Sequence, residues 1–287
     1  MFDSVARDGL LVQRPAPFRQ PGRIERNRVV TYCLGILSPE GLVLASDSRS
    51  NAGVDQVARV CKLTLLTVPG ERVIAILGAG NLATTQAVVS QLHQAQGGGA
   101  AGLDVNMAPT MFDVATIVGD KLRDVVARDG RYVEPYGDPS ASFLVAGQIR
   151  GGPQRLFEIY SAGNFVEAFP RYNFLQIGET KYGKPILDRA LRSDSPLDEA
   201  AKLALLSFDA TIRSNLSVGL PIDILRYRAD SFSTADLATL DEDNAYWSAL
   251  REGYSDGLSA LIDSLPAPPP HWGPDAAPRD YQENAVA

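Results

Sequence analysis

Apolar residues in this chain occur in short dense runs, and these runs predict strands that are buried on both faces. Residues 31–37 and 42–45 are apolar at nearly every position, and the Ser-Pro-Glu-Gly sequence at 38–41 has the composition of a tight turn. The two runs therefore predict a β-hairpin. Because alternate residues of a strand point to opposite faces, such runs are typical of a sheet that is covered on both sides.

The remaining pattern predicts blocks of strands separated by pairs of helices. Strands are predicted at residues 63–68, 72–77, 142–148, 155–161, 165–169, 174–176 and 222–227, and helices at 82–94, 112–128, 183–192, 196–213 and 241–264. This order favours two packed sheets with helices outside them, whereas a doubly wound fold would alternate single strands and helices. Since no repeat or internal boundary interrupts the pattern, a single domain is predicted over residues 31–265.

Composition limits the class of protein. The chain has 287 residues, of which 45% are hydrophobic and 21% charged, so it can bury a sizeable core. The net charge of −7 argues against a nucleic-acid partner, since phosphate binding requires an excess of Lys and Arg. No apolar run approaches the ~18 residues of a membrane span, and the two cysteines, Cys33 and Cys61, are too few for a disulfide framework. A cytoplasmic protein that does not associate with membranes is therefore expected.

The two ends of the chain differ in character from the part between them. Residues 1–29 contain six arginines and three prolines against three acidic residues. The prolines exclude a regular helix, and the segment lacks the apolar core of a secretion signal. We expect residues 1–30 to be a disordered extension or a wrongly assigned start. Residues 266–287, which begin in a proline-rich run, are expected to be a flexible tail.

Histidine is too scarce for the common hydrolase mechanisms. His93 lies in a predicted helix and His271 in the proline-rich tail, so neither is well placed to serve as the base for a serine or cysteine nucleophile. The two histidines and two cysteines also lack the spacing of zinc ligands. If the chain is an enzyme, we expect its base to be another group, and no metal or organic cofactor is expected.

Thr31 could supply both catalytic groups if the mature chain began there. Its hydroxyl could attack a carbonyl carbon, and its α-amine, with a reference pKa of about 7.7–8.0, could accept the proton. A nearby cation such as Lys62 favours the neutral amine, and Asp47 is a suitable partner for a lysine among apolar strands. The predicted hairpin places the end of its second strand, and hence Asp47, beside Thr31.

Four segments around these residues resemble proteasome-type β-subunits, which are N-terminal-nucleophile (Ntn) hydrolases of the threonine protease kind. They are 31–35 (TYCLG), 45–53 (ASDSRSNAG), 62–63 (KL) and 78–80 (GAG). Two later segments resemble the bacterial ancestral β-subunit branch of this family. They are 176–188 (QIGETKYGKPILD) and 213–219 (RSNLSVG).

The resemblance implies a fold and a set of roles. The fold is a four-layer αββα sandwich of the α+β class. The nucleophile and base would be Thr31, with Asp47 and Lys62 orienting it and tuning its amine. Backbone N–H groups near the Gly-Ala-Gly turn at 78–80, which begins with Gly78, would form the oxyanion hole, and Ser217 resembles the serine that supports the amine.

The family also implies partners. Arg49 and Asn51, in segment 49–53, would line the substrate cleft and pair with an extended peptide. The substrate would be a peptide or related amide, and the subunits would self-associate into a ring or ring-like spiral. Simpler interpretations are that Arg49 anchors carbonyl groups and that Ser217 belongs to an ordinary turn. The sequence does not reveal whether an ATP-driven unfoldase feeds the protein.

Two departures from the family pattern concern the surroundings of Thr31. Segment 178–180, with Glu179 at its centre, replaces the usual Gly-Ser-Gly, and Ser214 replaces an aspartate. The supporting hydrogen bonds therefore differ, and an amide substrate other than a peptide is compatible with the sequence. Val30 stands where a glycine commonly precedes the cleavage point. We hypothesise that a GTG codon at position 30 is the true start, with self-cleavage as the alternative.

Two other functions fit parts of the sequence. Proteasome rings contain inactive structural subunits with N-terminal extensions, and this chain would be one if residues 1–30 persisted. Residues 73–83 match the strand–GxGxxA–helix fingerprint of NAD-binding oxidoreductases. That interpretation also requires an acidic residue after a second strand about 20 residues later, where the chain has the glycine-rich segment 96–102.

Overall fold

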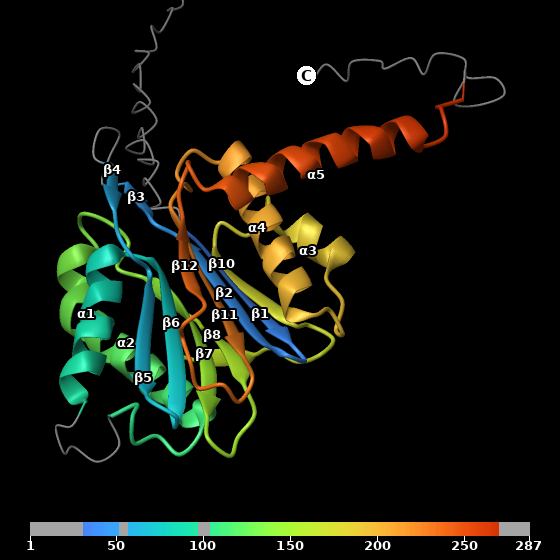
Figure 1. The fold of residues 1–287 in the computed structure, drawn as a ribbon. Coiled ribbons are helices and arrows are strands. Elements are labelled where there is room, and N and C mark those ends of the chain that lie inside the picture. The colour runs from blue at the N-terminus through green and yellow to red at the C-terminus, as the bar shows by residue number, and fades with distance from the viewer. Residues whose placement is uncertain (1–30, 52–56, 97–103, 270–287) are drawn as a thin grey trace, which may run out of the picture.

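The computed structural model describes residues 31–51, 57–96 and 104–269 and contains two antiparallel sheets packed face to face (Figure 1). The interpretations given to residues 1–30 and to the tail beyond residue 269 lie outside the described residues. Within these ranges no helix has the length and apolar character needed to cross a membrane.

The first sheet is built around the predicted hairpin. Its strand order is β10-β1-β2-β11-β12. The strands are β1 (Tyr32–Ser38), β2 (Gly41–Asp47), β10 (Phe174–Gly178), β11 (Ile222–Arg228) and β12 (Leu237–Leu240). Within the hairpin Cys33 lies opposite Ser46, and on the other side of β1 Tyr32 lies opposite Gly178. The ends of β2 and β10 therefore both reach the residue that precedes β1, Thr31.

The second sheet has the order β5-β6-β7-β8-β9. Its strands are β5 (Leu63–Val68), β6 (Arg72–Gly80), β7 (Ala141–Ile149), β8 (Arg155–Ile159) and β9 (Phe165–Glu167), and a short ribbon of β3 (Arg49–Asn51) and β4 (Val57–Arg59) precedes them. β6 pairs antiparallel with both of its neighbours. Dinucleotide-binding folds place this fingerprint on a strand of a parallel sheet, so the NAD-binding interpretation of residues 73–83 is wrong.

Helices cover the outer faces of both sheets (Figure 1). α1 (Leu82–Ala95) and α2 (Met111–Val133) pack on the second sheet, and α3 (Lys184–Ala190) and α4 (Leu197–Ser214) pack on the first. α5 (Ala245–Ser264) contacts α4 near its start, where Trp247 is buried, and then extends away from the body.

Three apolar clusters fill the spaces between the four layers. Strand β1 contributes side chains to two of these clusters, which explains why its sequence is apolar throughout. Tyr32, Leu34 and Ile36 belong to the cluster under α4, whereas Cys33 belongs to the cluster between the sheets. Side chains on both faces are therefore buried. The predicted αββα sandwich of the α+β class is confirmed.

Three strands were not predicted. β3, β4 and β12 have only three or four residues each, and such segments are too short to establish a period of two. β12 forms because it pairs with the longer strand β11, and β3 and β4 form because they pair with each other. These pairings belong to the tertiary structure and leave no pattern in the sequence.

Candidate active site

The hairpin brings the Asp47 carboxylate to the start of β1. Asp47 is fully buried, and its Oδ1 accepts a hydrogen bond from the Tyr32 N–H at 3.0 Å while its Oδ2 accepts one from the Arg49 N–H at 3.2 Å. Burial raises the pKa of Asp47, and Lys62, followed by these two N–H donors, opposes that shift. The carboxylate is thereby fixed beside the backbone of Thr31.

Lys62, which directly precedes β5, turns its ammonium group into the protein. Nζ donates to Asp47 Oδ1 at 2.7 Å and to the Arg49 carbonyl at 2.6 Å, and the side chain is only 6% exposed. It is therefore not a solvated surface lysine. A buried ion pair seldom adds much net stability, because desolvation of two charges offsets their attraction. Stability alone therefore does not explain why Lys62 and Asp47 are paired inside the protein.

Thr31 is held by the neighbouring strand β10. The Glu179 N–H donates to the Thr31 carbonyl at 2.7 Å, and Thr31 is 2% exposed. Gly178 makes this approach possible: its φ is +84°, and a Cβ there would lie 1.8 Å from the Thr31 carbonyl oxygen. The backbone of the predicted nucleophile is thus fixed from one side through Tyr32 and from the other by β10.

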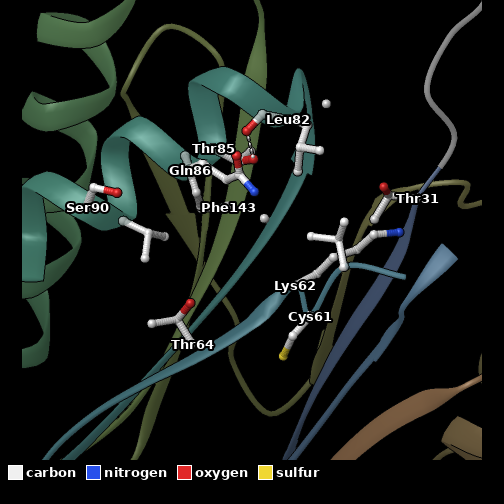
Figure 2. A pocket seen from close by; sticks show the side chains of 13 residues that line it. Thr31, Cys61, Lys62, Thr64, Leu82, Thr85, Gln86, Ser90 and Phe143 are labelled. Carbon is white, nitrogen blue, oxygen red and sulfur yellow. Dashed lines mark hydrogen bonds between the residues drawn. The ribbon is translucent and has the colours of Figure 1, made fainter. Parts of the chain in front are cut away.

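A cavity of about 320 Å³ opens beside Thr31, between the end of β6 and helix α1 (Figure 2). Thr31 and Lys62 line one end of it, and Gly78 and Gly80 line its edge along β6. In Figure 2 the side chains of Thr31 and Lys62 both reach the same corner of this space. The volume is at the small end of the range for ligand sites.

The amide of Gly78 is engaged in strand pairing. Its N–H donates to the Lys62 carbonyl at 3.2 Å. In an antiparallel ladder successive N–H groups point to alternate sides. Since the Asn81 N–H donates to the Ser140 carbonyl at 2.9 Å, next to β7, we infer from this alternation that the Gly80 N–H points to the opposite side, and Gly80 also lines the cavity. Gly80 is therefore better placed than Gly78 to offer an amide to a bound oxyanion.

Ser217 has no hydrogen bond to Thr31 among the described residues. Its N–H donates to Asn215 Oδ1 at 2.9 Å, which agrees with the turn interpretation. The group that reaches toward Thr31 from this segment is Asn215, whose Nδ2 donates to Glu179 Oε2 at 3.0 Å. Glu179 is 8% exposed, and its Oε1 accepts from the Lys181 N–H at 3.1 Å. A buried carboxylate thus stands one residue beyond the strand that holds Thr31, and sequence analysis missed its contact with Asn215.

Arg49 anchors a loop and does not line the cavity. Its Nη1 donates to the Leu216 carbonyl at 2.7 Å, and it packs over Gly219, where a Cβ would lie 2.5 Å from Arg49 Cζ. The cavity lining does not include it, so the anchoring interpretation is the one the geometry supports. Asn51 pairs with Val57 in the β3–β4 ribbon. Its side chain, with residues 52 and 53, lies outside what the structure describes.

The two cysteines occupy different environments. Cys33 is buried between the sheets, and burial raises the pKa of its thiol, so it is inert. Cys61 is exposed and lines the cavity, a position that sequence analysis did not foresee. Its thiol donates to the Leu63 carbonyl at 3.2 Å. In the described ranges no group of three His, Cys, Asp or Glu side chains could hold a metal ion.

Comparison with known proteins supports the same family. Residues 30–225 match the proteasome subunit family. The chain belongs to this family. It is 28% identical over 202 residues to proteasome subunit beta 2 of Pyrobaculum neutrophilum, a match that covers 70% of this chain and 90% of the relative.

Solved structures of family members share both sequence and fold with the chain. Anbu (ancestral beta-subunit) from Yersinia bercovieri is 44% identical with a TM-score of 0.79, covering 83% of this chain and 99% of that one. The helical assembly of the Anbu complex from Pseudomonas aeruginosa is 46% identical with a TM-score of 0.80, covering 85% and 100%. The resemblance to bacterial ancestral β-subunits is therefore confirmed, and the chain is a proteasome-like β-subunit.

Proposed function

We propose that this chain is a threonine-type peptidase or amide hydrolase that uses Thr31, as the first residue of the mature chain, both as nucleophile and as base. The observation that carries the proposal is the buried Lys62–Asp47 pair, which ends on a cavity that Thr31 also lines. An ammonium group in this position favours the neutral form of a neighbouring amine. The substrate is a peptide bond or a related amide bond.

In the proposed reaction Thr31 Oγ attacks the carbonyl carbon of the substrate, and its proton passes to the α-amine. The Gly80 N–H meets the negative charge that develops on the carbonyl oxygen. The protonated amine then gives its proton to the leaving nitrogen, which departs and leaves an ester on Thr31. Water that has lost a proton to the same amine hydrolyses the ester and regenerates the hydroxyl.

The mechanism requires a free amine at Thr31, so residues 1–30 must be absent from the active form. Intact-mass spectrometry of the expressed full-length chain tests this requirement. We expect a mass that begins at Thr31. A GTG codon at position 30 would identify internal initiation as the source of that terminus, and any other codon would leave self-cleavage.

The proposal predicts that Thr31→Ala abolishes covalent labelling. A small β-lactone should acylate the Thr31 hydroxyl of the wild type and add one adduct mass, whereas Thr31→Ala should add none and should assemble normally in light scattering. Thr67→Ala, which removes an exposed hydroxyl from β5 outside the cavity, is the matched control and should label like the wild type. Equal labelling of the wild type and Thr31→Ala would contradict the proposed mechanism.

We also propose that the subunits self-associate into a ring or ring-like spiral in the cytoplasm. The support is membership of the proteasome subunit family and the likeness to an Anbu complex whose structure is described as a helical assembly. Mass photometry of the wild type should show a multimer at nanomolar concentration, and a monomer alone would contradict this part of the proposal.

A structural subunit without hydrolase activity is the second candidate. The observation that favours it is Glu179, a buried carboxylate close to Thr31 where the family pattern has a serine. A nearby negative charge favours the protonated amine, which cannot act as a base. A mass that retains residues 1–30, together with an unlabelled Thr31, would establish this alternative.

A further inference from the structure

The cavity carries four uncharged polar side chains on two walls. Thr64 comes from β5, whereas Thr85, Gln86 and Ser90 come from α1. Positions 86 and 90 are one helical turn apart and share a face of α1. Figure 2 shows Thr64 across the open space from Gln86 and Ser90, and Phe143 also lines the cavity. The cavity therefore combines an apolar surface with polar groups that face one another.

The lining as a whole is close to neutral. Lys62 is its only charged residue among those that the structure describes, and its Nζ is already bound by Asp47 Oδ1 at 2.7 Å and the Arg49 carbonyl at 2.6 Å. A charged substrate side chain would find no free counter-charge here. The lining therefore favours neither acidic nor basic side chains.

The polar groups offer donors and acceptors together. Thr85 Oγ1 donates to the Leu82 carbonyl at 2.9 Å and keeps its lone pairs. In the described part of the chain the side chains of Thr64, Gln86 and Ser90 have no hydrogen-bond partner of their own. Gln86 alone supplies two donors and one acceptor. A wholly apolar substrate side chain would cover these groups and leave them unpaired.

We propose, resting on the hydrolase function above, that this cavity receives the side chain on the acyl side of the cleaved amide and selects an uncharged chain with an apolar stem and a carboxamide head, as in glutamine. The stem contacts Phe143, and the carboxamide pairs with Gln86 and the hydroxyl of Thr64 or Ser90. Gln86 is the specificity-determining residue, because its side chain presents both a donor and an acceptor to the space.

The test measures covalent labelling of the purified full-length protein by four peptide vinyl sulfones that differ only in the side chain next to the reactive group: glutamine, leucine, lysine or glutamate. Thr31 Oγ adds to the vinyl carbon distal to the sulfur, and the hydroxyl proton ends on the carbon beside the sulfur. Intact-mass spectrometry gives each rate. We expect the glutamine probe to react about tenfold or more faster than the others, and rates within about twofold of one another would overturn the proposal.

Substitution of Gln86 tests its role directly. Gln86→Glu places a carboxylate in the cavity at an exposed helix position, and we expect the lysine probe to become the fastest. Gln94→Glu adds the same charge to the same helix at an exposed position outside the lining, so the glutamine preference should persist. A Gln86→Glu protein with an unchanged order of rates would overturn the assignment.

A β-lactone without a peptide side chain distinguishes the failure of this proposal from failure of the hydrolase function. If the lactone labels Thr31 and the four peptides react equally, only the selectivity is wrong. If neither the lactone nor any peptide labels Thr31 of the wild type, the hydrolase function is wrong and the selectivity falls with it.

Discussion

The sandwich buries polar side chains at both of its ends, and the two ends differ in what those side chains face. At the end of β2, Asp47 and Lys62 form an ion pair beside Thr31 and an open cavity. At the opposite end, near the turn between β1 and β2, the Tyr227 hydroxyl donates to Gln148 Oε1 at 2.7 Å. The side chains of Asp47, Lys62, Gln148 and Tyr227 are almost inaccessible to solvent.

The cluster at the far end, formed by Gln148, Tyr227 and Asp230, is complete in itself. Gln148 Nε2 donates to Asp230 Oδ1 at 2.8 Å and to the Gly152 carbonyl at 2.9 Å, and Gln148 Oε1 also accepts from the Asp230 N–H at 2.8 Å. The side-chain amide of Gln148 thus uses both its donors and its acceptor oxygen. The cluster links β7 of one sheet to the end of β11 in the other. Buried polar side chains alone therefore do not single out a candidate site, and the open cavity beside Asp47 and Lys62 is what distinguishes that end of the sandwich.

Breaking the ion pair should have the largest effect. Lys62→Met leaves Asp47 buried without its cation, so we expect a loss of about 3–5 kcal/mol in the free energy of unfolding. Labelling of Thr31 by the β-lactone should fall about 100-fold or more, because the amine loses the charge that keeps it neutral. Urea unfolding and labelling rates measure the two effects.

A double substitution separates stability from chemistry at this end. Lys62→Met combined with Asp47→Leu replaces the pair by apolar side chains, which should recover the part of the lost stability that comes from the unpaired charge, although the Tyr32 and Arg49 N–H groups then lack their acceptor. Labelling should remain as slow as in Lys62→Met. A double variant that regains both properties would show that the pair acts only on folding.

Alkaline pH should weaken the site end through Tyr32. Its hydroxyl is bonded to Ser207 and Gln176 in the core under α4, and burial raises its pKa to about 12 from 10.0. The unfolded chain loses this proton first, so stability that is present below pH 10 is lost as the pH rises toward 12. The loss should reach about 2 kcal/mol, and Tyr32→Phe should remove most of it.

Urea unfolding at about pH 8 and about pH 11 measures the first part of this loss, which should be about 1.4 kcal/mol at the higher pH. Tyr246→Phe is the matched control, since Tyr246 is 52% exposed, and it should retain the alkaline loss of the wild type. The same slope of stability against pH in Tyr32→Phe and wild type would assign the effect to other groups.

Glu179 should set the pH dependence of labelling as a positioning residue. Its carboxylate accepts hydrogen bonds from Asn215 and from a backbone N–H, and it lies close to Thr31. Glu179→Gln removes a negative charge that favours the protonated amine, so the midpoint of the labelling profile should move about one pH unit lower, and labelling at neutral pH should rise up to about tenfold.

The control for this prediction is Glu158→Gln in β8. Glu158 is also a partly buried carboxylate, with a pKa raised by burial, but it belongs to the second sheet and does not line the cavity. Its profile should match the wild type. Coincident profiles for all three proteins would exclude a charge effect of Glu179 on Thr31.

The smallest effect is expected at the far end. Tyr227→Phe removes one hydrogen bond to Gln148 and should lower the free energy of unfolding by about 1 kcal/mol. Labelling of Thr31 should be unchanged, because the cluster has no contact with the cavity. A fall in labelling without a fall in stability would show that the two ends are coupled.

The layers of the fold could be predicted because positions that are buried in the folded protein are occupied by apolar residues. β1 alternates between two cores, with Leu34 on one side and Cys33 on the other, and is therefore apolar throughout. The position of Asp47 beside Thr31 also followed from the sequence, since a hairpin relates the two through local geometry. Gly178 and Gly80 have φ of +84° and +104°, a conformation that favours glycine. The need for this conformation follows from how the strands pair, so the sequence alone does not reveal it.

The remaining contacts of the site depend on distances that no local pattern encodes. Asn215 meets Glu179 because α4 ends at the level where β10 ends, although the two residues are 36 positions apart. Arg49 Nη1 donates to the Leu216 carbonyl across 167 positions, a contact that the sequence around Arg49 does not predict. The family resemblance identified the residue types, but the register between helix and sheet decides which of them touch.

Gly178 also limits how the protein can be re-engineered. A single methyl group at that position would overlap the Thr31 carbonyl oxygen, so Thr31 and the last residue of β10 must be treated as one rigid unit. Directed evolution of new chemistry should therefore leave position 178 fixed and concentrate its libraries on the walls of the cavity, where side chains end in open space.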